Sequence, residues 1–194
     1  LVSPTLPFGF NFSQSEMRPD SRTYSEGQRG EIIENTMISS TYLETIGVPI
    51  VEGRGIAETD VAGSPEVIVI NQTMARTFWP NQSAVGRTVQ VINGSRSRTY
   101  RIVGVNGNHK QHGVLERAAP FVYFADAQRG NATYKFIVAR SSGGADTLLS
   151  AMRRELLAME PGLVFMGSAT MAQNMGTSLM PARAGALLAA AFGG

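Results

Sequence analysis

The sequence predicts a mixed α+β fold, because short apolar runs typical of strands alternate with segments of helical periodicity. The runs at 66–70 (EVIVI) and 121–124 (FVYF) are rich in β-branched and aromatic residues, which is typical of buried strands. Between residues 146 and 159 the apolar residues instead recur at helical spacing, and a Pro-Gly pair follows at 161–162. With 194 residues, 43% of them apolar, the chain can form one large domain or two small ones.

The first third of the chain is expected to be extended or looped up to a strand near 30–39. A short helix at 40–46 follows, in which Thr41 and Glu44 have the spacing of a capping box. Gly47 fits the left-handed position that commonly ends a helix. This part of the chain therefore contains a strand, one helical turn and a sharp stop.

The middle of the chain contains a second predicted helix. Asn71 directly follows the strand at 66–70 and is a good N-cap, and Pro80 ends the helix. The apolar residues of this segment recur on one helical face, which predicts that the helix packs on a sheet. These residues are Met74, Ala75, Phe78 and Trp79.

A hairpin is predicted after this helix, with a strand from Gly86 to Val91, a turn at 93–95 (NGS) and a partner strand at 99–105. At the end of the chain, strands at 134–139 and 163–166 flank the helix at 146–159, which makes a β-α-β unit. The middle of the chain and this unit together predict two lobes.

Charge is unevenly distributed along the chain. Residues 1–66 carry ten acidic and four basic residues, whereas residues 67–183 carry five and thirteen. A basic stretch that includes Arg96, Arg98 and Arg101 suits nucleic acid or anionic headgroups, or it is a surface balanced by the acidic first third. No nucleic-acid-binding motif accompanies the charge, so we expect no nucleic-acid partner.

The glycines at 53 and 55, around Arg54, raise the question of a phosphate-binding loop. The chain has only two lysines, and neither completes the phosphate-loop pattern G-x-x-x-x-G-K-[ST]. The segment also does not open a long helix whose dipole would favour an anion. We therefore predict a tight corner in which the Arg54 guanidinium binds loop carbonyls or a carboxylate such as Asp60.

No catalytic residue, cofactor site or metal site is predicted. The chain has no cysteine, which excludes zinc–thiolate sites and thiol nucleophiles, and it has no G-x-S-x-G elbow. His109 and His112 form an i, i+3 pair without an apparent third metal ligand, so they are expected to be solvent-exposed loop residues. An enzyme alternative remains, in which these histidines and Asp126 converge in space.

The last eleven residues, 184–194, are almost purely Ala, Leu, Gly and Phe. They are too short to cross a bilayer, which needs about 20 apolar residues. They fit equally well the start of such a segment and an amphipathic helix docked on the core.

Three stretches resemble one known family. They are MISSTYLETIGVPIVEGRGIAETDVAGSPEVIVINQTMARTFWPNQSAVGRTVQV (37–91), YRIVGVNGNHKQHGV (100–114) and APFVYFADAQ (119–128). Together they resemble the extracytoplasmic core domain of MacB/FtsX-like ABC-transporter permeases. One departure is Asn108 after Gly107, where the family usually has aspartate, and both residue types favour turns.

The resemblance implies a porter-like β-α-β lobe built from residues 1–36 and 129–180, with a smaller sabre-like α/β lobe inserted at 37–128. Residues 181–194 then look like the start of a truncated second transmembrane helix. The positions that carry the motif are expected to be structural turn and lobe positions. They are Gly47, Gly53, Arg54, Gly55, Asn71, Trp79, Pro80, Gly86, Gly104, Pro120 and Tyr123.

The resemblance also implies a location and a role. The domain would lie on the extracytoplasmic side of the bacterial inner membrane and transmit ATP-driven conformational change for efflux, lipoprotein extraction or envelope regulation. ATP would be hydrolysed by a separate cytoplasmic ATPase, and the implied partners include a second permease subunit and a periplasmic protein. The domain itself would be non-catalytic and need no cofactor. The alternative is a passive binding domain for peptide, lipid or envelope polymer.

Overall fold

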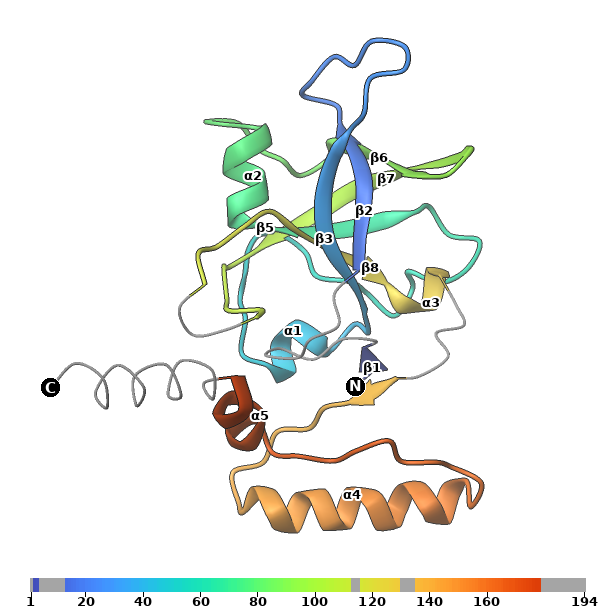
Figure 1. Cartoon of the computed structure of the whole chain (residues 1–194), viewed down its shortest axis with the longest axis vertical. Coiled ribbons are helices and arrows are strands. Elements are labelled where there is room, and N and C mark those ends of the chain that lie inside the picture. Colours follow the sequence, from blue (N-terminus) through green and yellow to red (C-terminus); the bar gives the residue numbers. More distant parts are fainter. Residues whose placement is uncertain (1, 4–12, 113–115, 130–134, 179–194) are drawn as a thin grey trace, which may run out of the picture.

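The mixed α+β fold is confirmed by a computed structural model that describes residues 2–3, 13–112, 116–129 and 135–178 (Figure 1). The strands are β1 (Val2–Ser3), β2 (Ser13–Pro19), β3 (Glu31–Ile38), β4 (Ile50–Gly53), β5 (Val67–Asn71), β6 (Thr88–Asn93), β7 (Arg96–Asn106), β8 (Phe121–Ala125) and β9 (Phe136–Ile137). The helices are α1 (Tyr42–Thr45), α2 (Gln72–Phe78), α3 (Asp126–Arg129), α4 (Ala145–Met159) and α5 (Met171–Ser178).

Seven strands form one sheet in the order β4-β7-β5-β8-β3-β2-β6, and β6 also pairs with β7. Strands β7, β5, β8, β3, β2 and β6 therefore close into a ring, with β4 as an added strand on β7. Closure is possible because β7 is 11 residues long. Residues 96–101 of β7 pair with β6, and residues 104–106 pair with β4 on the same edge of β7. On the opposite edge, residues 101–106 pair with β5.

The two central strands, β5 and β8, are buried on both faces, as their unbroken apolar runs predict. One set of alternating side chains packs inside the ring with α2, and the other set packs on the opposite face beneath α1. The first set is Ile68, Ile70, Val122 and Phe124 with Met74 and Phe78. The second is Val67, Val69, Phe121 and Tyr123 with Tyr42 and Leu43.

The predicted strand near 30–39, the helix after Asn71 and the hairpin around 93–95 are all confirmed, as β3, α2 and the β6–β7 pair. Strand β2 lies in a region expected to be only extended or looped. Its sequence gives little signal, because polar residues dominate it and only Met17 and Pro19 are buried. It is nevertheless the strand that joins β3 to β6 and completes the ring.

The capping box predicted for Thr41 and Glu44 is wrong. The Thr41 backbone has φ −92° and ψ 2°, rather than the extended conformation of most N-caps, and its side chain makes no capping hydrogen bond. The helix is one turn long. Gly47 does adopt the predicted left-handed conformation after it, with φ 75°.

The C-terminal part contains the predicted helix, α4, but not the predicted strand at 163–166. After the turn at 161–162 the chain runs to α5 outside any strand, and Val164 and Met166 are 87% and 88% exposed. Apolar residues there favour a strand, but no described strand offers them an edge to pair with. The strand predicted at 134–139 is reduced to β9, which pairs with β1, and residue 134 lies outside the described residues.

The predicted division into lobes stays a prediction. Its boundary between residues 36 and 37 falls within β3, and the seven-stranded sheet takes strands from both sides of that boundary. The segment predicted to begin a transmembrane helix, 181–194, lies outside the described residues. Within the described part of the chain, no helix has the length and apolar character needed to cross a membrane.

Gly104 provides a test of how tightly β4 packs on β7. A Cβ atom at this position would stand 2.0 Å from the backbone oxygen of Arg54, a contact that only backbone movement can relieve. We expect Gly104→Ala to lower the free energy of unfolding by about 3 kcal/mol in urea titrations followed by the fluorescence of the single tryptophan, Trp79.

Gly55→Ala is the matched control. Its Cβ would meet only the Ile50 side chain, at an ordinary 3.8 Å, so the expected change is within about 0.5 kcal/mol. Equal effects of the two substitutions would contradict the close β4–β7 packing.

Candidate functional site

The glycine-rich corner after β4 is held by an ion pair. The Arg54 guanidinium donates to both carboxylate oxygens of Asp60, at 2.7 Å and 3.0 Å, and to the carbonyl of Gly55 at 2.9 Å. This confirms the predicted contacts of the Arg54 guanidinium. The Asp60 side chain is only 8% exposed and also accepts the amide of Ala57 at 2.8 Å.

The corner is not arranged to bind phosphate. The amide of Arg54 donates to the carbonyl of Val103 at 2.9 Å, and the guanidinium is already used by Asp60. Gly53, with φ 70°, lies so close to β7 that a Cβ would stand 2.3 Å from the Val103 oxygen. The glycines are therefore required by close backbone packing.

Burial of the Asp60 carboxyl by itself raises its pKa, but the hydrogen bonds from Arg54 and from the Ala57 amide outweigh burial. The net pKa of Asp60 lies below that of an ordinary aspartate. The ion pair therefore stabilises the corner at neutral pH and weakens in acid.

Hydrogen bonds from Trp79 and Thr88 to Asp20 connect three elements, although no sequence pattern had indicated Asp20. The Trp79 indole N–H donates to Oδ1 of Asp20 at 2.9 Å, and the other oxygen of Asp20 accepts the amide of Thr88 at 2.8 Å. The end of β2, the end of α2 and the start of β6 are thus bonded through one carboxylate. Pro80 follows at the helix end, and Gly86 makes the turn into β6 with φ 88°.

Asn71 does more than cap α2. Its Oδ1 accepts the amides of Met74 at 2.9 Å and of Phe121 at 3.1 Å, and its Nδ2 donates to the carbonyl of Ala119 at 2.7 Å. One side chain therefore holds the start of α2 against the residues on both sides of Pro120, where β8 begins. The cap is readable from sequence, whereas the bonds across to β8 are not.

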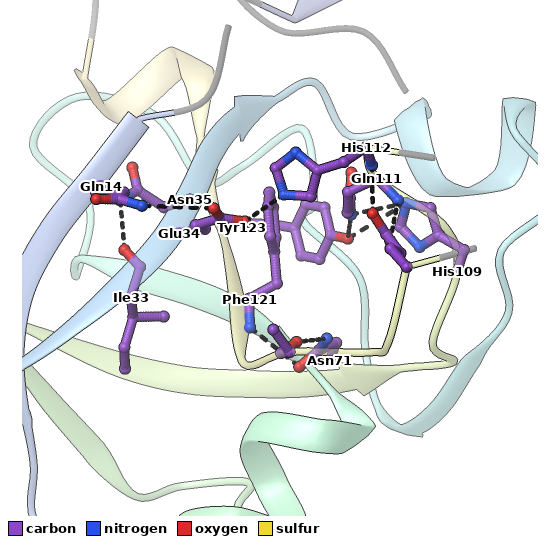
Figure 2. Close-up of polar contacts among 12 residues, drawn as sticks. Gln14, Ile33, Glu34, Asn35, Asn71, His109, Gln111, His112, Phe121 and Tyr123 are labelled. Atoms are coloured by element: carbon purple, nitrogen blue, oxygen red, sulfur yellow. Dashed lines mark hydrogen bonds and ion pairs between the residues drawn. The ribbon is translucent and has the colours of Figure 1, made fainter. Parts of the chain in front are cut away.

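A polar cluster lies beside the start of β8 (Figure 2). The Gln111 amide donates to the Tyr123 hydroxyl at 2.5 Å and lies 2.9 Å from Nε2 of His109. The His109 ring stacks on Tyr123, with centroids 6.0 Å apart. His109 is half-buried, so the prediction of an exposed loop histidine is wrong for this residue. Burial lowers the pKa of His109.

His112 points toward β3 instead, where its Nε2 lies 2.6 Å from the Glu34 carboxylate, and its side chain is 41% exposed as predicted. The Glu116 carboxylate accepts the backbone amides of Gln111 and His112, both at 2.5 Å. These contacts fix the path of the chain after β7 against β3 and β8.

The cavity within this cluster is small. Its volume is about 20 Å³, which is enough for one water molecule. Within the described ranges, no group of three or more His, Cys, Asp or Glu side chains is placed to bind a metal ion. Asp126, the third residue of the enzyme alternative, pairs with Lys135 at 2.8 Å. The described side chains of the cluster are engaged in hydrogen bonds and ion pairs with one another and with the backbone.

The three arginines of the basic stretch do not form a single surface. In the β6–β7 register Arg96 and Arg98 lie on the side of Val91 and Tyr100, and Arg101 lies on the other face with Thr88. Arg98 also pairs with Glu66 at 3.1 Å. This arrangement gives no support to a continuous site for an anionic polymer.

The sequence model of MacB-like periplasmic core domains matches residues 10–155 of the chain. The fold is similar to the periplasmic region of MacB from Actinobacillus actinomycetemcomitans, with a TM-score of 0.55 and 16% identity over 81% of this chain and 66% of that one. It is also similar to the extracellular domain of the ABC-type transporter YknZ from Gram-positive bacteria, with a TM-score of 0.50 and 15% identity over 77% and 73%. No curated protein sequence matches this chain.

The Arg54–Asp60 pair predicts an acid-sensitive contribution to stability. Because the pKa of Asp60 is lower in the folded than in the unfolded chain, the contribution is complete above the ordinary carboxyl pKa of about 4 and is lost as the pH falls through the folded value. We expect Asp60→Asn to cost about 1 kcal/mol at neutral pH, since Arg54 is half-exposed and screened by solvent.

The difference between Asp60→Asn and the parent chain should shrink in urea titrations at acidic pH. Glu155→Gln is the control, because Glu155 pairs with Arg154 on the exposed side of α4. A difference that stays constant with pH would rule out the ionised pair as its source.

His109 predicts a second pH dependence, in a higher range. Its folded pKa is lowered by burial, so stability is complete above the ordinary histidine pKa of about 6.5 and declines as the pH falls below it. We expect the urea midpoint to fall between about pH 7.5 and pH 5.5, and His109→Gln to reduce that fall. His112→Gln should retain it. An unchanged fall in His109→Gln would refute the assignment.

Proposed function

We propose a function that starts from the family of this chain, which belongs to the MacB-like periplasmic core domains. In this proposal the chain transmits ATP-driven conformational change on the extracytoplasmic side of the inner membrane. The observation that carries the proposal is the family match over residues 10–155. In this role the domain performs no chemistry, and a separate cytoplasmic ATPase supplies the energy. A second permease subunit and a periplasmic protein are its proposed partners.

The closed sheet supports such a role. A ring of strands with packed side chains inside and a second apolar layer outside deforms little, so a displacement applied at one end reaches the other. The polar side chains described above strengthen this ring where elements meet. Asp20 and Asn71 each bond two or more segments of the chain, and Asp60 holds the corner after β4.

The test uses the full permease with its ATPase, reconstituted in lipid. The described domain has no native cysteine, so a single spin label can be introduced at Thr99→Cys, an exposed position of β7. We expect the distance between the labels of two permease subunits to change when ATP binds and to return after hydrolysis. The measurement is a pulsed-dipolar distance distribution in each nucleotide state.

A permease paired with an ATPase that cannot bind ATP is the control, and its distances should stay constant. Distances that remain fixed while the wild-type ATPase hydrolyses ATP would overturn the proposal. Ligand binding by the domain under those conditions would instead favour the passive binding alternative.

A further inference from the structure

Two Asn-Gly dipeptides lie at the two ends of β7, at 93–94 and 106–107, in opposite environments. An Asn-Gly sequence is chemically labile, because glycine has no side chain to keep its backbone nitrogen away from the side-chain amide of the preceding asparagine. The reaction between these two groups also requires solvent, freedom of the backbone and nitrogens that are not held by hydrogen bonds. The structure therefore decides which of the two dipeptides reacts.

The first dipeptide lies at the free end of the β6–β7 hairpin. Asn93 is the last residue of β6 and pairs with Arg96, so Gly94 and Ser95 make the two-residue turn. Gly94 has φ 60°, a left-handed conformation that favours glycine at the first position of such a turn. All residues from 93 to 99 are exposed, and Figure 1 shows this end of the hairpin at the margin of the molecule.

The reacting groups at this turn are unrestrained. In the part of the chain that the structure describes, neither the Asn93 side chain nor the amide nitrogen of Gly94 has a hydrogen-bond partner. A Cβ built on Gly94 would have no heavy atom within 4 Å, so open space surrounds the backbone there. Solvent reaches both groups, and no neighbouring atom blocks their approach to each other.

The second dipeptide is restrained at each of these points. Asn106 is fully buried and pairs with Ile50 of β4 and Asn71 of β5. Its side-chain nitrogen donates to the carbonyl of Gly107 at 2.8 Å, and the amide nitrogen of Gly107 donates to the carbonyl of Pro49 at 2.9 Å. Both nitrogens that would react are therefore engaged, and only local unfolding releases them.

We propose that Asn93 is a site of spontaneous deamidation in the folded domain, and that burial and hydrogen bonding protect Asn106 from the same reaction. The Gly94 backbone nitrogen gives up its proton to a solvent base and attacks the side-chain carbonyl carbon of Asn93, forming a new carbon–nitrogen bond. The bond from that carbon to the side-chain nitrogen breaks, and the nitrogen takes up a proton and leaves as ammonia. The product is a cyclic succinimide.

Water then opens the succinimide at either of its two carbonyl carbons. One opening gives aspartate, and the other gives isoaspartate, in which the backbone runs through the former side chain. In total, one water is consumed and one ammonia is released, without an oxidant or a cofactor. Each product carries a carboxylate at the turn, beside Arg96, and lowers the formal net charge of +2 by one. The reaction needs neither the permease nor ATP, so it is independent of the proposed function.

The test incubates the full 194-residue chain in mildly alkaline buffer and follows two of its tryptic peptides by mass spectrometry. Trypsin cleaves after lysine and arginine and so releases the dipeptides separately, in peptides 88–96 and 102–110. We expect peptide 88–96 to gain about 1 Da, the mass difference between a carboxyl and an amide group. This gain should be at least about tenfold faster than in peptide 102–110. Aspartate and isoaspartate forms should both appear.

Asn93→Gln is the matched variant, because its longer side chain disfavours closure of the ring. It should lose the mass gain in peptide 88–96 and leave peptide 102–110 unchanged. In urea the two peptides of the parent chain should react at similar rates, because unfolding exposes Asn106. An unincubated sample gives the background from digestion, fragment spectra locate the modified residue, and Trp79 fluorescence verifies that the incubated chain is folded.

Three results would overturn the proposal. A constant mass of peptide 88–96 in the folded chain would show that the turn does not react. Equal rates for the two peptides in the folded chain, or a slow reaction of peptide 102–110 in urea, would show that the fold does not protect Asn106. Aspartate without isoaspartate would show direct hydrolysis of the side chain instead of attack by the Gly94 nitrogen.

Discussion

The closed sheet depends on strand β7, because this strand pairs with three neighbours along its length. It accepts β6 and β4 on one edge and β5 on the other, and only this sharing allows the sheet to close. The close approach of β4 requires glycine on both strands, at Gly53 and Gly104. Closure then gives the interior its single packed core and determines where every connecting loop leaves the ring.

The polar residues serve this closed framework. Asp60 closes the corner after β4, Asp20 joins α2 to β2 and β6, and Asn71 joins α2 to β8. Each satisfies backbone or side-chain donors that would otherwise be costly to bury. The histidine cluster does the same for the loop after β7. Their hydrogen bonds hold segments of the domain together.

Features that depend on neighbouring residues were predictable from the sequence, and features that depend on distant partners were not. The buried strands, the Asn71 cap, the left-handed Gly47 and the Arg54–Asp60 pair all follow from residues within a few positions of each other. The burial of His109 depends on Tyr123 and Gln111 arriving from elsewhere. Segment 163–166 has apolar residues that favour a strand, but it forms none. A strand also needs the edge of a neighbouring strand to pair with, and the local sequence does not show whether one is present.

Closure has a further consequence for how copies of this domain behave beside one another. A closed ring leaves few strand edges unpaired, and in the described sheet the outer edge of β4 is one that has no neighbouring strand. That edge is four residues long, shifts register between Ile50 and Glu52, and ends at a left-handed glycine followed by Arg54. A short, kinked and charged edge is a poor template for another strand. The outer edge of β4 is therefore protected against pairing with a strand of another molecule.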